Sequence, residues 1–226
     1  MIRFSGVYDL LKGRDMDKLL SIDSPVMKGL TFVVNLVLLN ILFILTSLPI
    51  ITVGASLCAL QTSIQNILHK KDSSITKNYL RIFKANFKNS TLFYLVTIFL
   101  TGIMYLDFRL ISRFPIVVKY GIGMTIILII LSLIILMSYY YAYIGRYENS
   151  IKTTLKNIGM ISLQNLFQTI FLVIYNIFII YFTFSSPASL ITMIYFGTFI
   201  GFALINLGSG IIIKQVFDKI EVKKFN

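Results

Sequence analysis

The sequence predicts an all-α fold, a polytopic transmembrane helical bundle of five or six spans with short amphipathic interfacial helices. The chain is 57% hydrophobic and only 13% charged over 226 residues, a composition typical of multi-span membrane proteins. From Asn157 to Ile213 it contains no Asp, Glu, Lys, Arg or His, and about 20 apolar residues suffice for one crossing. Six apolar segments follow one another along the chain, at 29–48, 49–68, 89–106, 120–144, 161–184 and 190–213.

The first 28 residues are mostly polar, and we expect residues 1–28 to form a cytoplasmic amphipathic segment. The transmembrane bundle then occupies residues 29–213, and residues 214–226 form a basic cytoplasmic tail. No small-x-small cleavage motif follows the first apolar run, which favours an uncleaved first helix over a secretory signal.

The second segment, 49–68, is the most polar of the six, and three interpretations remain open: a full span, a re-entrant piece, or a helix in the membrane interface. Pro49 disfavours helix at the residues before it. Thr52 can cap the helix that restarts there, and Gly54 permits close approach of a neighbouring helix. Together, Pro49, Thr52 and Gly54 favour a structural elbow, although broken helices also line binding sites in transporters.

Basic residues determine the expected orientation. Those of the N-terminal region and of the 69–88 loop are cytoplasmic by the positive-inside rule, so an even number of crossings separates the two regions. Both termini are then cytoplasmic in a multi-pass protein of the plasma membrane. Of the 21 Lys and Arg residues, only Arg109, Arg113 and Lys119 lie outside. This distribution explains the net charge of +12, and we expect no nucleic-acid partner.

Two cytoplasmic connections show the amphipathic spacing of helices that lie on an anionic leaflet. In 76–88, aromatic residues recur every four positions on one face, and in 149–160 an apolar stripe faces away from the charges. Each of these helices leads directly into a long span. The residues expected at the lipid headgroups are Lys77, Arg81, Lys84, Lys88, Lys152 and Lys156.

The polar residues inside the spans are amides and hydroxyls. An unpaired amide is costly in lipid, so these side chains are expected to hydrogen-bond between helices. The alternative is a polar cavity for a hydroxylated ligand such as a sugar. Gly197 and Gly201 form a GxxxG pattern that permits close packing within the bundle or in a homo-oligomer. The amides in the first, fifth and sixth spans are Asn35, Asn40, Gln164, Asn165, Gln168, Asn176 and Asn206, of which Asn35, Asn40, Asn165, Gln168 and Asn176 are the candidates for partner contacts.

Residues that carry common catalytic chemistry are scarce. The single histidine, His69, is expected to be an interfacial residue at a helix end, and the single cysteine, Cys58, a buried packing residue. We find no metal-ligand cluster, no Gly-rich phosphate loop and no proton relay in the spans. We therefore expect no catalytic, cofactor-binding or metal-binding residues, and no enzyme. The tyrosines at 139–147 are expected to form an aromatic belt.

One string resembles a known family. Asn40-Ile41-Leu42, followed by Leu48-Pro49-Ile50-Ile51-Thr52-Val53-Gly54-Ala55 and then Ala59-Leu60, resembles the opening motif of the YesL-like bacterial membrane proteins, a domain of unknown function. Residues 83–88 and parts of 143–157 resemble its later blocks. The resemblance implies a multi-span protein of the bacterial cytoplasmic membrane whose genes lie beside carbohydrate ABC importers, and it supplies no catalytic residues.

The leading hypothesis is a non-enzymatic accessory or regulatory membrane protein associated with the permease subunits of a carbohydrate ABC importer, with the lipid bilayer as its other partner. One alternative is a small transporter or channel for a polar solute. Another is an immunity or sensing protein against membrane-active peptides.

Overall fold

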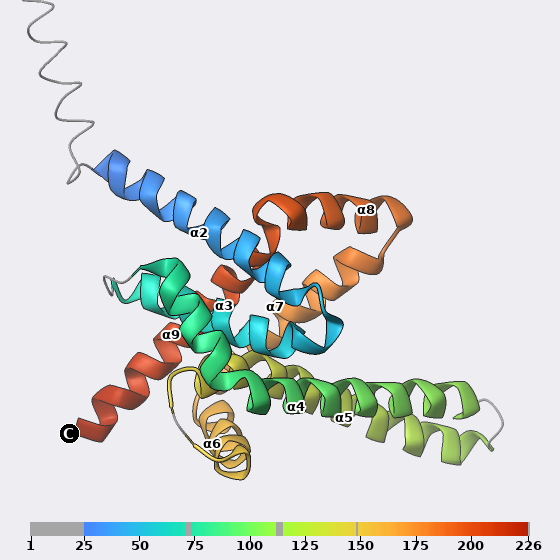
Figure 1. The fold of residues 1–226 in the computed structure, drawn as a ribbon. Helices are drawn as coiled ribbons and strands as arrows, with labels where there is room; N and C mark the ends of the chain where they lie inside the picture. The colour runs from blue at the N-terminus through green and yellow to red at the C-terminus, as the bar shows by residue number, and fades with distance from the viewer. Residues whose placement is uncertain (1–24, 71–73, 112–114, 148, 226) are drawn as a thin grey trace, which may run out of the picture.

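The computed structural model describes residues 25–70, 74–111, 115–147 and 149–225 (Figure 1). This part of the chain is helical and contains no strand, which confirms the predicted all-α fold. The expected amphipathic segment lies almost wholly in residues 1–24, outside the described residues. The elements are α2 (Pro25–Ser47), η1 (Ile50–Thr52), α3 (Val53–Leu68), α4 (Ile75–Leu110), α5 (Ile116–Ile144), α6 (Ile151–Gln164), α7 (Leu166–Phe184), α8 (Pro187–Phe196), the π-helical turn η3 (Gly197–Gly201) and α9 (Phe202–Phe225).

Six helical stretches in the described residues are long and apolar enough to cross a membrane, by length and composition. They are α2, η1 with α3, α4, α5, α7, and α8 continued through η3 into α9. In Figure 1 the start of α2, the end of α3 and the end of α9 lie at the left, whereas the ends of α2, α4 and α7 lie at the right. Successive spans therefore alternate in direction, and the molecule is a multi-pass integral membrane protein.

Helix α3 lies at the centre of the bundle. Of its span, 61% is buried inside the protein, against 22% or less for each of the other five. Its neighbours are α2, α4, α5 and α9. The second apolar segment is thus a core helix, which explains why it tolerates so many hydroxyls and amides: its surroundings are protein rather than lipid.

The elbow before α3 is built by its own backbone and by Thr52. The Thr52 amide donates to the Pro49 carbonyl at 2.8 Å, and the Thr52 hydroxyl donates to the Pro49 and Thr46 carbonyls. The expected side-chain cap of α3 by Thr52 is wrong, because the hydroxyl points back toward α2. At Gly54, a Cβ atom would lie 2.6 Å from the Tyr94 Cβ, so only glycine permits this approach of α4.

The basic segment 76–88 is helical as predicted and continues into the following span as one 36-residue helix, α4. Lys77, Arg81, Lys84 and Lys88 are exposed along it, and Lys152 and Lys156 are exposed on α6. α6 and α7 are separated by a break at Asn165 (φ −126°, ψ 53°), so the predicted fifth span begins at Leu166. Residues 214–225 are helical and continue α9.

The tyrosines at the end of α5 belong to the core. Tyr139 and Tyr140 have no exposed surface, and Tyr141 and Tyr143 are only 3% and 5% exposed. Tyr140 stacks on Phe93 of α4 with ring centroids 3.6 Å apart. The prediction of an aromatic belt is therefore wrong. These rings fix the register of α4 against α5, because aromatic pairs have defined geometry.

Candidate functional site

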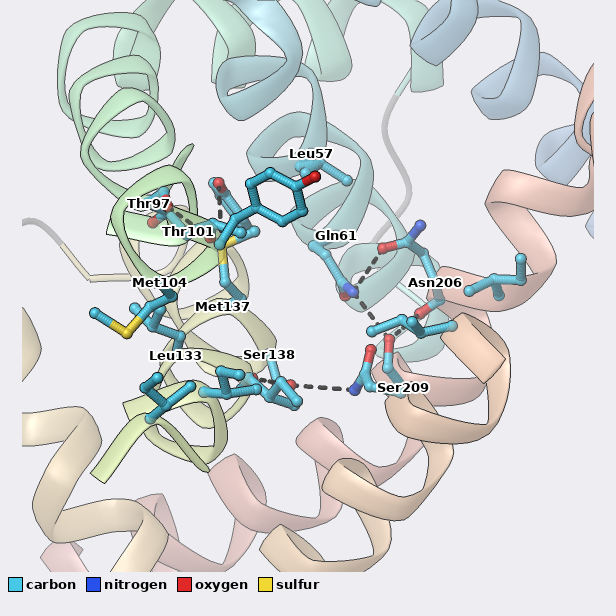
Figure 2. Close-up of a pocket in the computed structure, with 18 of the residues that line it drawn as sticks. Leu57, Gln61, Thr97, Thr101, Met104, Leu133, Met137, Ser138, Asn206 and Ser209 are labelled. Carbon is cyan, nitrogen blue, oxygen red and sulfur yellow. Dashed lines mark hydrogen bonds between the residues drawn. The ribbon is translucent and has the colours of Figure 1, made fainter. Parts of the chain in front are cut away.

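A cavity of about 620 Å³ lies between the α4–α5 hairpin and helices α7 and α9, with α3 at its back (Figure 2). Its volume falls within the range of small-molecule sites in proteins. Five helices contribute to its wall, which has more apolar than polar residues. The lining residues are Leu57, Gln61, Thr97, Thr101, Met104, Tyr105, Phe108, Ile126, Ile130, Leu133, Ile134, Met137, Ser138, Tyr141, Asn176, Ile180, Ile205, Asn206 and Ser209.

Five of the lining side chains form the polar corner of the cavity: Gln61, Ser138, Asn176, Asn206 and Ser209. Gln61 Nε2 donates to Asn206 Oδ1 at 2.8 Å and to Ser209 Oγ at 3.0 Å, which joins α3 to α9. Asn176 Nδ2 donates to Ser138 Oγ at 3.1 Å, which joins α7 to α5. Figure 2 shows Gln61, Ser138, Asn206 and Ser209 on the side of the cavity away from Met104 and the α4 threonines.

The polar corner retains unused hydrogen-bonding capacity. Gln61 is 6% exposed, and its buried Oε1 has no hydrogen-bond partner. Asn176 uses both of its bonds as a donor, to Ser138 and to the Leu172 carbonyl, so its Oδ1 accepts none from the described residues. Asn176 Oδ1 is thus left as an acceptor at the cavity, whereas Gln61 Oε1 has almost no accessible surface. No carboxylate, amine, guanidinium or imidazole is among the lining residues.

A second polar contact surrounds the π-helical turn η3. Asn40 of α2 is fully buried; its Nδ2 donates to the Gly197 carbonyl at 2.8 Å, and its Oδ1 accepts from the Ala203 amide at 3.1 Å. A π-helical turn interrupts the regular backbone hydrogen bonds of an α-helix. The Asn40 side chain therefore satisfies backbone groups on both sides of η3 and joins the GxxxG pattern to the first span.

A third cluster joins the ends of α3, α5 and α9. Asp218 lies 2.9 Å from His69 Nε2 and 2.6 Å from Lys214 Nζ. Glu221 accepts from Arg146 at 2.7 Å and from the Tyr147 hydroxyl at 2.7 Å. Burial raises the pKa of the Tyr147 phenol, which keeps it protonated as a donor. His69, expected to be an interfacial residue, is held in this cluster.

The structure brings together only some of the residues singled out from the sequence. Asn40 meets Gly197 beside Gly201, and Asn176 reaches the cavity. Asn165 is 4% exposed and bonds to its own helix at Ile161. Asn35 and Gln168 are half-buried and have no side-chain hydrogen bond within the described part of the chain. Pro49, Thr52 and Gly54 form the elbow and are not among the residues that line this cavity.

Sequence reasoning missed the residues that form the centre of the polar corner. Gln61 and Ser209 are ordinary members of apolar runs, and no spacing distinguishes them. A signal was present in the hydroxyls and amides of segment 49–68, which indicated a helix shielded from lipid. Within the described residues, no group of three or more His, Cys, Asp or Glu side chains could hold a metal ion.

In the described part of the chain, these features define an all-α integral membrane protein whose six candidate membrane-spanning helices, among them the central polar helix α3, form a bundle with a cavity at its side. A family model described as "Protein of unknown function, DUF624" matches residues 36–108. The match covers the second half of α2, all of α3 and nearly all of α4, so the chain is similar to that family over much of its first three spans. No curated protein and no solved structure matches the chain.

Proposed function

We propose that this protein is a non-enzymatic accessory or regulatory protein of the bacterial cytoplasmic membrane, YesL-like in type, that associates with the permease subunits of a carbohydrate ABC importer. The resemblance of Asn40 and of residues 48–60 to the opening motif of that family supports the proposal, and the family match over residues 36–108 is compatible with it.

The observation that carries the non-enzymatic part is the chemistry of the cavity wall. Most of its amide and hydroxyl groups are already engaged with neighbouring helices, as the bonds of Gln61 to Asn206 and Ser209 illustrate. General acid–base catalysis needs a titrating group within reach of the substrate. The lining offers amides, hydroxyls and two phenols, of Tyr105 and Tyr141. Such a wall is suited to binding by shape and hydrogen bonding.

The motif residues support a role as a scaffold. Asn40 stabilises the turn at Gly197, and Gly54 permits the close approach of α4 to α3. The residues that resemble the family therefore hold the first three spans together and secure the last one. The exposed basic residues at the start of α4 and on α6 support an orientation with both termini in the cytoplasm, because the cytoplasmic loops of membrane proteins carry an excess of Lys and Arg.

The experiment is affinity purification of the tagged full chain from native membranes in mild detergent, with mass spectrometry of the proteins that accompany it. A second tagged polytopic protein of similar abundance is the control for detergent carry-over. Permease subunits enriched at near-stoichiometric amounts relative to the control are the expected result. A protein that purifies alone, under conditions that keep importers assembled, contradicts the association.

The cavity favours a second candidate, a small transporter for a solute. Its volume of about 620 Å³ would hold a small molecule, but its apolar wall suits a polar solute poorly. Liposomes that contain the purified protein provide the test: uptake of a labelled sugar above that of protein-free liposomes would establish transport, and identical uptake would exclude it for that sugar.

A further inference from the structure

We propose that the cavity binds an uncharged amphiphile of the monoacylglycerol class, with its hydroxylated head at the polar corner and its acyl chain between α4 and α5. This inference does not depend on the importer, because it concerns a ligand taken from the lipid phase. Four observations support it: the shape of the cavity, the division of its wall, the unused amide acceptor, and the position of its opening.

The cavity is long enough for an acyl chain. Its lining on α5 runs from Ile126 to Tyr141, which at 1.5 Å per residue corresponds to about 22 Å along the helix. On α4 it runs in the opposite direction, from Thr97 to Phe108. The stacking of Phe93 on Tyr140 aligns the start of one stretch with the end of the other. The site is therefore an elongated slot parallel to the two helices.

The wall of the slot divides into a polar and an apolar end. Along the two helices, Ser138 and Tyr141 of α5 lie at the same end of the slot as Thr97 of α4, whereas Phe108 and Ile126 mark the opposite end. Since no Asp, Glu, Lys, Arg or His lines the slot, a charged head would be buried without a counter-ion, at a cost far above that of a neutral polar group. The division thus selects an amphiphile, and the missing charges select an uncharged head.

The polar corner favours hydrogen-bond donors. Asn176 is half-buried, and its Oδ1 accepts no hydrogen bond from the described residues. Gln61 Oε1 also lacks a partner, but it has almost no accessible surface and lies toward Gly210 of α9, so the acceptor that a ligand meets is Asn176 Oδ1. Ligand hydroxyls are donors as well as acceptors, so a glycerol head matches this corner better than an ester or an alkyl group does.

The opening of the slot lies on the surface that lipid covers. Tyr105, Phe108 and Ile130 line the cavity and are also 60%, 66% and 43% exposed. All three belong to the membrane-spanning stretches of α4 and α5. The ligand therefore enters sideways from the bilayer, and its chain never has to cross water.

The test uses the purified full chain in phosphatidylcholine vesicles that contain a diazirine-bearing monoacylglycerol. After irradiation, the labelled peptides are mapped by mass spectrometry. We expect saturable labelling of lining residues on α4 and α5, such as Met104 and Met137. Unlabelled monoolein should compete about tenfold better than oleate or hexadecane, a difference equivalent to about 1.4 kcal/mol. If hexadecane competes as well as monoolein, the polar corner plays no role in binding. If oleate competes as well as monoolein, the site has no preference for an uncharged head.

Two matched variants on α5 separate the slot from general lipid contact. Ile134→Trp fills the cavity, whereas Ile127→Trp places the same ring on an exposed position that does not line it. We expect Ile134→Trp to reduce labelling about tenfold and Ile127→Trp to leave it unchanged. Equal labelling of the two variants, or labelling spread evenly over exposed faces, refutes the proposal. If Ile134→Trp fails to fold, the competition series on the unaltered protein still supports or overturns the proposal.

Discussion

The substitution Asn40→Leu tests whether one buried amide stabilises the irregular last span. It keeps a side chain of similar size in the site and removes the bonds to the Gly197 carbonyl (2.8 Å), the Ala203 amide (3.1 Å) and the Thr198 carbonyl (3.3 Å). The backbone groups at the ends of η3 then remain buried without their partner. The expected result is a large loss of stability with no change in membrane insertion.

The magnitude follows from the two shorter bonds. Interhelical hydrogen bonds in membranes contribute about 0.6 kcal/mol on average and up to about 1.7 kcal/mol, so two of them amount to roughly 1–3 kcal/mol. The unpaired backbone groups exclude the lower end of this range. We expect a loss of about 2 kcal/mol in the free energy of unfolding, or nearly a thirtyfold shift of the unfolding equilibrium.

The assay is equilibrium unfolding of the purified protein in mixed micelles of a mild detergent and SDS. The control is Asn35→Leu, an amide on the same helix that is half-buried and forms no side-chain hydrogen bond with the described residues. It should change the free energy of unfolding by less than about 0.5 kcal/mol. If the two variants unfold at the same SDS fraction, Asn40 does not stabilise η3 and the reasoning is refuted.

Three further predictions concern other contacts. Gly54→Ala forces α4 away from α3 and should lower the apparent Tm by several degrees in a detergent thermal-shift assay, whereas Gly102→Ala, in open space, should lower it little or not at all; equal losses would disprove the close approach. Glu221→Gln removes one charge from the cluster at the end of α9 and, because the pair is partly exposed, should cost under about 1 kcal/mol. It should nevertheless speed hydrogen exchange at that end relative to Lys219→Gln, and unchanged exchange would show that the cluster does not hold the helix. Cys58 has no exposed surface, so it should resist a membrane-permeant maleimide until SDS unfolds the protein; rapid labelling of the native protein would contradict its burial.

The sequence was sufficient for the class of fold because the signal was carried by long stretches. Apolar runs without charge predict membrane helices whatever their neighbours are, and six were found where six apolar segments were expected. The boundary of α4 was less accurate, since a helix in a membrane protein continues into water without any change of backbone. The boundary at Asn165 was missed for the opposite reason, because the helix breaks there inside a continuous run of uncharged residues.

The candidate site could not be predicted, because it depends on contacts between distant residues. Gln61 meets Asn206 and Ser209 across 145 and 148 positions of sequence, and hydrophobic periodicity carries no information about such pairs. The tyrosines of α5 were misplaced for a related reason. An aromatic residue near a membrane boundary suits both a lipid-facing belt and a buried core, and only the packing of α4 against α5 decides between them.

The central position of α3 has a consequence for the biogenesis of the protein. Of the six spans it has the lowest hydropathy, and the hydroxyls and amides that suit a protein environment penalise insertion of an isolated helix into lipid. We expect α3 to leave the translocon together with α2 and α4 as one packed group of three helices. In this group Gly54 of α3 already contacts α4, and the elbow at Pro49 is already formed. The order of synthesis would then protect the most polar helix from lipid before the later spans enclose it.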